Sequence, residues 1–235
     1  MRSELFDQSH NETQSQQRFA LQNKRMLKAT LGADVLAAKG AMVAFQGQVQ
    51  FHHEGSGSLG KLVRRALTSE DTPLMRVSGQ GEVFFAREAA EIFLLQLVGD
   101  GISINGRSLL AFDATLAWDV HRTKGAGMMT SGLFNTVITG EGTVALTSDG
   151  EPLILDCAQQ PTFVDVQAAV CWSANLEPNV VNSMNMKSML RGGSGEAFQY
   201  AFSGPGFVVV QPSEGPTVPP HSHSGGGGAA LGNLG

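Results

Sequence analysis

The fold of this chain is decided by the stretch VSGQGEV at residues 77–83, which recurs as ITGEGTV at 138–144 and as FSGPGFV at 202–208. A G-x-G inside a strand pattern marks a bulge or the close approach of another backbone, where a Cβ would clash or φ must be positive. No helix start follows any copy, and no third glycine completes a dinucleotide fingerprint. The motif therefore predicts β structure rather than a phosphate-binding loop.

A second motif precedes each copy of the first. It reads AFQGQV at 44–49, AFDATL at 111–116 and CWSANL at 171–176, with an aromatic residue in second place each time: Phe45, Phe112 and Trp172. Two motifs in matched order, three times, indicate an internal triplication. We expect the three aromatic side chains to occupy equivalent buried positions.

The segments around these motifs have the character of short strands. Residues 83–86, 92–98 and 207–210 are rich in β-branched or aromatic side chains and are bounded by Gly, Asp or Pro. The sequence predicts an all-β domain over residues 19–211, with three tandem β units at about 19–86, 87–150 and 151–211. Residues 1–18 are expected to be flexible, and the Pro/Gly/Ser/His-rich segment 212–235 is expected to be a disordered tail.

The composition narrows the class of protein. Charged residues make up 16% of the 235-residue chain, below the average of about 25%, and the net charge is −5. An acidic chain lacks the overall positive field that nucleic-acid-binding proteins usually carry. Cys157 and Cys171 lie in apolar stretches, which favours small buried side chains, with a disulfide as the alternative. With no signal-peptide pattern and no long apolar run, we expect a cytoplasmic protein that is either free or peripheral to a membrane.

These motifs resemble a known family. Residues 40–44 after a Leu-Gly-Ala-Asp turn, the G-x-G strands and the closing GFVVVQ at 206–211 are similar to the altered-inheritance-of-mitochondria protein twenty-four family. The resemblance covers about residues 19–211. It implies a fold similar to the tryptophan RNA-binding attenuation protein, a shortened double-stranded β-helix repeated three times around a pseudo-threefold axis. It also implies a loose functional analogy to yeast relatives at the mitochondrial inner membrane, and the absence of a transit-peptide pattern indicates a prokaryotic member.

The sequence offers no set of residues with recognisable catalytic or metal-binding spacing. His52 and His53 are adjacent, so in a strand they point to opposite faces and cannot chelate one ion. His221 and His223 lie in the expected tail without a third ligand. We therefore predict no catalytic, cofactor-binding or metal-binding residues and no cofactor. An enzyme of the double-stranded β-helix class would instead require a buried polar cluster in a concave pocket.

The connection between the two motifs of each unit is basic and apolar. The three connections, at 57–67, 121–133 and 183–195, contain seven of the sixteen basic residues and none of the twenty-one acidic ones. In one interpretation they cap the core. In the other they gather at one end of the molecule and bind an anionic surface or partner. The candidate binding residues are Lys61, Arg64, Arg65, Arg122, Lys124, Met128, Met129, Met184, Met186, Lys187, Met189 and Arg191.

The leading functional hypothesis is a non-enzymatic binding or scaffold protein, peripheral to a membrane through these connections. The expected partners are an anionic membrane surface or an acidic protein, and a homo-oligomer is compatible with the sequence. The alternative is an RNA-binding or oligomeric regulatory protein, which rests on the fold resemblance alone. The acidic composition and the lack of interleaved basic and aromatic residues argue against RNA.

Overall fold

The computed structural model describes residues 3–53, 74–123, 134–182 and 198–213. Two short 3-10 helices, η1 (Glu4–Phe6) and η2 (Gln8–His10), precede the sheet. Everything else that is regular is strand, which confirms the predicted all-β class. The strands of the first third of the chain are β1 (Phe19–Asn23), β2 (Met26–Leu31), β3 (Val35–Ala38), β4 (Met42–His53) and β5 (Leu74–Phe85).

Ten further strands follow. The central ones are β6 (Glu91–Asn105), β7 (Leu109–Asp113), β8 (Ala117–Arg122) and β9 (Phe134–Ser148). The last are β10 (Leu153–Asp156), β11 (Thr162–Asp165), β12 (Ala169–Ser173), β13 (Asn179–Asn182), β14 (Phe198–Phe202) and β15 (Phe207–Val210).

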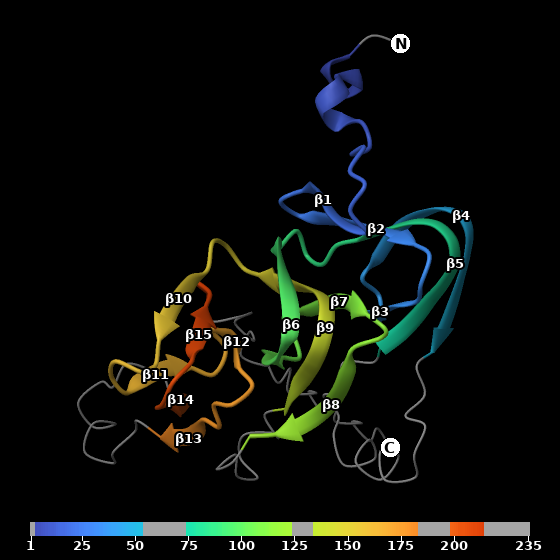
Figure 1. Cartoon of the computed structure of the whole chain (residues 1–235). Helices are drawn as coiled ribbons and strands as arrows, with labels where there is room; N and C mark the ends of the chain where they lie inside the picture. The colour runs from blue at the N-terminus through green and yellow to red at the C-terminus, as the bar shows by residue number, and fades with distance from the viewer. Residues whose placement is uncertain (1–2, 54–73, 124–133, 183–197, 214–235) are drawn as a thin grey trace, which may run out of the picture.

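The strands form one large antiparallel sheet and one small one (Figure 1). The large sheet has twelve strands and contains the path β1-β2-β5-β3-β7-β9-β6-β12-β15-β10, with β4 added beside β5 and β8 beside β9. The small sheet has the order β11-β14-β13. Strands from the three parts of the chain therefore join directly through the backbone, at β3–β7 and at β6–β12.

The two sequence motifs pair with each other in the same register in all three parts of the chain. The aromatic of the second motif lies opposite the final valine of the first, as Phe45↔Val83, Phe112↔Val144 and Trp172↔Val208. The register also shifts just before the small residue each time, between Met42 and Ala44, between Leu109 and Ala111, and between Ala169 and Cys171. Three copies of one unit would have this same pairing and this same register shift. Their arrangement as a double-stranded β-helix around a threefold axis stays a prediction.

The glycines of the first motif allow neighbouring groups to approach the backbone closely, as the sequence predicted. Gly81 has φ +142°, and a Cβ there would lie 2.0 Å from the backbone oxygen of Gln46 on the neighbouring strand. In the later copies the space is filled by side chains instead. A Cβ on Gly142 would lie 3.1 Å from Oδ2 of Asp113, and one on Gly206 would lie 2.9 Å from Oγ of Ser173. Those oxygens accept hydrogen bonds from Thr143 N and Phe207 N. The absence of a side chain at each glycine therefore leaves room for an oxygen that binds the next backbone N–H along the chain.

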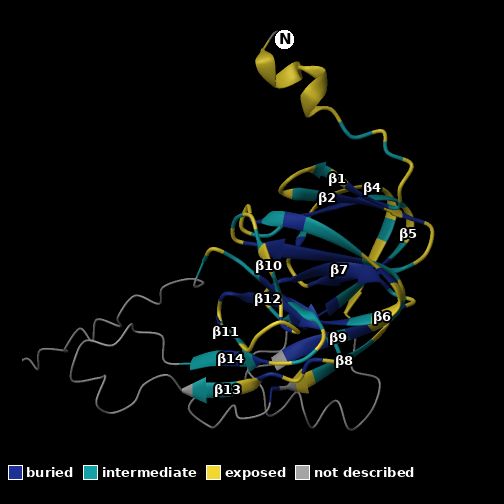
Figure 2. Ribbon diagram, turned by 60° about the vertical axis from the view of Figure 1, so that its left-hand side comes forward, coloured by how far each residue is buried: buried dark blue, intermediate teal, exposed yellow. Residues whose placement is uncertain are grey.

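The core runs through the middle strands, and one predicted core residue is absent from it (Figure 2). Phe112 and Trp172 are 0% and 1% exposed, whereas Phe45 is 46% exposed, so the prediction of three equivalent buried aromatics was wrong at Phe45. Phe45 differs from the other two aromatics in burial because of how its strand is paired. β7 and β12 each pair with a strand on both edges, whereas β4 pairs with β5 alone among the described residues. The ring of Phe45 instead packs edge-on against Phe51, with centroids 5.4 Å apart.

Both cysteines are buried free thiols, as the apolar context predicts. Burial raises the pKa of the Cys171 thiol to about 12. Cys171 lies opposite Val209 as Ala111 lies opposite Ala145, so it occupies the small-residue position of the motif.

Truncation of the motif aromatics measures this difference in burial. Phe112→Ala should destabilise the protein by about 3–5 kcal/mol, because it empties a fully buried site. Phe45→Ala should cost only about 1 kcal/mol, because nearly half of the side chain is already in water. Urea unfolding of both variants checks this, and equal losses would contradict the exposed placement of Phe45.

The thiol of Cys171 should be inert in the folded protein. With a pKa near 12, only about one thiol in ten thousand is ionised at pH 8, and the thiolate is the reactive form. Iodoacetamide should label Cys171 only after unfolding, and Cys171→Ala should cost no more than about 1 kcal/mol. Rapid labelling of the native protein at Cys171, located by peptide mass mapping, would show that the site opens to solvent.

Candidate interaction surfaces

The predicted binding residues lie almost entirely outside the described chain. The exception is Arg122, which ends β8, and the structure describes its backbone position only. The residues outside the described ranges are Lys61, Arg64, Arg65, Lys124, Met128, Met129, Met184, Met186, Lys187, Met189 and Arg191.

The strands that carry these connections are described, and they have a common design. Each connection joins an antiparallel pair, and the last pairs before it are His53↔Met75, Arg122↔Phe134 and Asn182↔Phe198. The connection-bearing ends of β4–β5, β8–β9 and β13–β14 lie in the lower half of Figure 1, on the side away from the N-terminal 3-10 helices. The three attachment points thus share the lower half of this view, with β4–β5 ending at the right of the molecule and β13–β14 at the left.

Two apolar surfaces at strand edges were missed by the sequence reasoning. One surrounds β10 and β11, where Leu153, Ile154 and Phe163 are exposed beside a hollow of about 450 Å³ lined by residues 154–156 and 159–163. The other is the free edge of β4, where Val43 and Phe45 are exposed. The sequence signal for the first was the run Leu153-Ile154-Leu155 in a short strand. Nothing in the sequence showed that, among the described residues, each of these strands pairs along one edge only.

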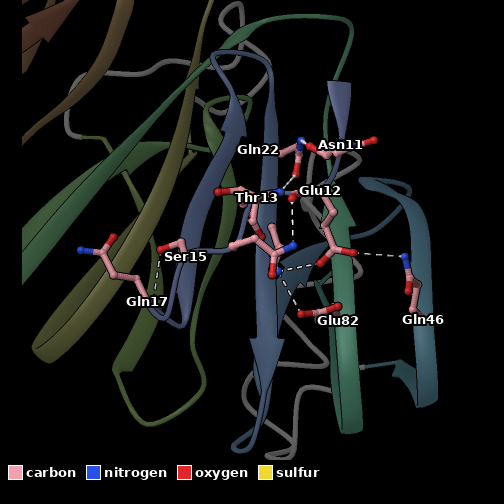
Figure 3. Close-up of polar contacts among 10 residues, drawn as sticks. Asn11, Glu12, Thr13, Ser15, Gln17, Gln22, Gln46 and Glu82 are labelled. Atoms are coloured by element: carbon pink, nitrogen blue, oxygen red, sulfur yellow. Dashed lines mark hydrogen bonds and ion pairs between the residues drawn. The ribbon is translucent and has the colours of Figure 1, made fainter. Parts of the chain in front are cut away.

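A polar cluster attaches the N-terminal segment to the first part of the sheet (Figure 3). Lys28 on β2 is only 4% exposed, and its Nζ lies 2.6 Å from Oε1 of Glu12 and 2.9 Å from Oε1 of Glu82. It also donates to the carbonyl of Thr13 at 2.9 Å. The hydrogen bond from Lys28 holds the pKa of Glu12 below its usual value, and the same bond raises the pKa of Lys28. The cluster is structural, because carboxylates already neutralise its one ammonium group.

The described residues were searched for metal-binding groups and for membrane-spanning helices. Across these ranges no three His, Cys, Asp or Glu residues lie close enough to hold a metal ion. Within the same part of the chain, no helix is long and apolar enough to cross a bilayer. The features that stand out are free strand edges, exposed apolar side chains and the attachment points.

The described residues define an all-β protein with exposed apolar side chains on strands β4, β10 and β11. The family model described as Mitochondrial biogenesis AIM24 matches residues 19–213. The chain therefore belongs to the mitochondrial biogenesis AIM24 family, as the motifs predicted. A crystal structure of a Streptococcus pyogenes protein has a similar fold, with a TM-score of 0.65 and 21% identity, over 82% of this chain and 91% of that one. The sequence matches none of the curated proteins.

The Glu12–Lys28 contact should make stability depend on pH in acid. The folded-state pKa of Glu12 is depressed, so its contribution is present above the ordinary value of 4.5 and is lost as pH falls through the lowered pKa. Glu12→Gln should cost about 1 kcal/mol at pH 7, since Glu12 is partly exposed to solvent, and less at pH 3. Urea unfolding at both pH values tests this, with Glu4→Gln as a control. A loss for Glu12→Gln that is equal at both pH values would exclude the ion pair as its cause.

Proposed function

We propose that the chain is a non-enzymatic scaffold that binds an anionic membrane surface through its three basic-apolar connections. The observation that carries this proposal is that the strand pairs β4–β5, β8–β9 and β13–β14 all end in the lower half of Figure 1, away from the N-terminal 3-10 helices. The connections contain seven basic residues and no acidic ones, in a chain of net charge −5. Membership of a family described by mitochondrial biogenesis supports a scaffold role.

The proposed binding has a salt-sensitive and a salt-resistant part. Each Lys or Arg close to an anionic leaflet contributes about 1 kcal/mol, and this attraction fades as added salt shortens the Debye length. The methionine and leucine side chains of the connections add apolar burial that salt does not weaken. The two parts together predict binding that decreases with salt without disappearing.

Cosedimentation with vesicles containing phosphatidylserine tests the proposal. The wild type should sediment with anionic vesicles at low salt and less so with phosphatidylcholine alone. The charge-reversed variant should lose binding by about a hundredfold or more without a change in melting temperature, because four attractive charges become repulsive. Its substitutions are Arg64→Glu, Arg65→Glu, Lys124→Glu and Lys187→Glu.

The matched control carries the same change in net charge at exposed positions outside the connections. Its substitutions are Lys24→Glu, Arg25→Glu, Lys39→Glu and Arg107→Glu. The control should bind nearly as the wild type does. If both variants lose binding equally, net charge rather than the connection face is responsible. If the wild type ignores anionic vesicles at low salt, the membrane proposal is wrong.

A further inference from the structure

The chain makes the same strand-to-strand junction twice. At the first junction β3 pairs with β7, and at the second the latter part of β6 pairs with β12. The pairs are Val35↔Asp113, Leu36↔Phe112 and Ala37↔Ala111 at the first junction, and Ile102↔Ser173, Ser103↔Trp172 and Ile104↔Cys171 at the second. A matching backbone hydrogen bond closes each, from Ala114 N to Asp34 O and from Ala174 N to Gly101 O, both at 3.2 Å.

The register inside each unit identifies which strands are the counterparts of these. Val35 and Ile102 lie opposite Val77 and Ile138, each two residues before the first motif glycine. Thr162 lies opposite Phe202, which precedes Gly204 in the same way, so β11 is the counterpart of β3 and of the latter part of β6. On the other side of the junction, β4 is the counterpart of β7 and β12, because Phe45, Phe112 and Trp172 share one register.

Both counterpart strands have a free edge. Among the described residues β4 pairs only with β5, and β11 pairs only with β14. Residues at the two existing junctions are buried, whereas the equivalent phenylalanines on these two strands are exposed. Phe45 is 46% exposed and Phe163 is 58% exposed. β4 lies beside β5 at the opposite side of the molecule from β11 (Figure 1), so the two edges do not meet within one chain.

The edge of β4 is also unprotected. Edge strands are normally kept from pairing with other chains by charged residues, proline, short length or a covering element. β4 runs for twelve residues, MVAFQGQVQFHH, without one Lys, Arg, Asp, Glu or Pro. Such a strand offers a row of unpaired backbone groups for a partner strand of suitable register.

We propose that a second copy of this chain completes the third junction, with β11 of one molecule pairing antiparallel with β4 of the next. The two existing junctions fix its register as Thr162↔Gln46, Phe163↔Phe45 and Val164↔Ala44. Gly47 N then donates to the carbonyl of Pro161, as Ala114 and Ala174 donate in the chain itself. The exposed rings of Phe45 and Phe163 bury each other. Because the two edges differ, the contact is head-to-tail and generates a ring or a filament.

Complementary variants test the direction of the contact. The wild type should self-associate with rising concentration in sedimentation velocity runs, and Phe45→Asp or Phe163→Asp should each weaken this by at least about tenfold. An equimolar mixture of the two variants keeps one intact junction, between Phe45 of one and Phe163 of the other, and should form heterodimers and nothing larger. The exposed Val98, changed to Asp, is the control and should behave as the wild type does.

The other outcomes of this experiment are distinct. If Phe45→Asp abolishes association while Phe163→Asp does not, the contact is β4 against β4 and the proposed register is wrong. A wild type that stays monomeric up to high concentration also overturns the proposal. Circular dichroism and melting temperature establish that each variant is folded, which the exposure of both side chains favours.

A disulfide trap provides a second test that does not depend on affinity. The hydrogen bond of Ala114 to Asp34 makes the pair two residues further along, Phe112 and Leu36, hydrogen-bonded as well, because such pairs alternate. The equivalent pair of Phe45 and Phe163 then has a Cα separation of about 5.5 Å, within disulfide range.

Singly substituted chains separate contact between copies from closure within one chain. Phe45→Cys mixed with Phe163→Cys, in a background with Cys157→Ala and Cys171→Ala, should yield a disulfide-linked heterodimer on mild oxidation. Phe45→Cys mixed with Val98→Cys should not. Absence of the heterodimer overturns the proposal. So does a doubly substituted chain, Phe45→Cys with Phe163→Cys, that oxidises only within itself, since this shows closure of a single chain.

Discussion

The structure depends on the second backbone edge of the strand that carries the motif aromatic. In β7 and β12 one edge pairs inside the unit and the other pairs with the preceding unit. Each such contact joins the core of one unit to the next and buries the aromatic between them. Buried backbone N–H and C=O groups require a partner, so these junctions are obligatory once the aromatic is buried. The burial of Phe112 and Trp172 and the exposure of Phe45 follow from this one constraint.

Glycines and register shifts shape the contact between the two motifs inside each part of the chain. The register shift before Ala44, Ala111 and Cys171 increases the local twist of each strand and turns it across its partner. At the crossing, Gly142 and Gly206 leave room for the oxygens of Asp113 and Ser173, which hold Thr143 N and Phe207 N. The same residues therefore provide backbone hydrogen bonds and close packing. This explains why the motif is recognisable in sequence while its middle residue varies between Gln, Glu and Pro.

The sequence predicted what is local and repeated. The β class, the two motifs repeated in matched order and the small buried position of Cys171 follow from patterns that can be read along the chain. The exposure of Phe45 could not be read in this way, because its sequence context matches that of Phe112 and only the absence of a neighbouring strand distinguishes them. The Glu12–Lys28 ion pair was missed for the same reason, since its partners are far apart in sequence. Of the candidate site, the sequence supplied the charges, and the structure supplied the positions at which the flanking strands end.

A chain with three units and two junctions necessarily retains one unused edge of each kind. Repeat proteins usually manage this problem with atypical terminal units whose outer faces are polar. Here the first unit carries a long uncharged strand at its open edge, and the last carries an exposed phenylalanine on the strand of matching register. Neither end has the composition of a cap. Among the described residues, β4 and β11 each lack a second partner strand and lie on opposite sides of the molecule. They match the two halves of the contact that the chain makes twice, and this complementarity favours a further copy of the chain over an unrelated partner.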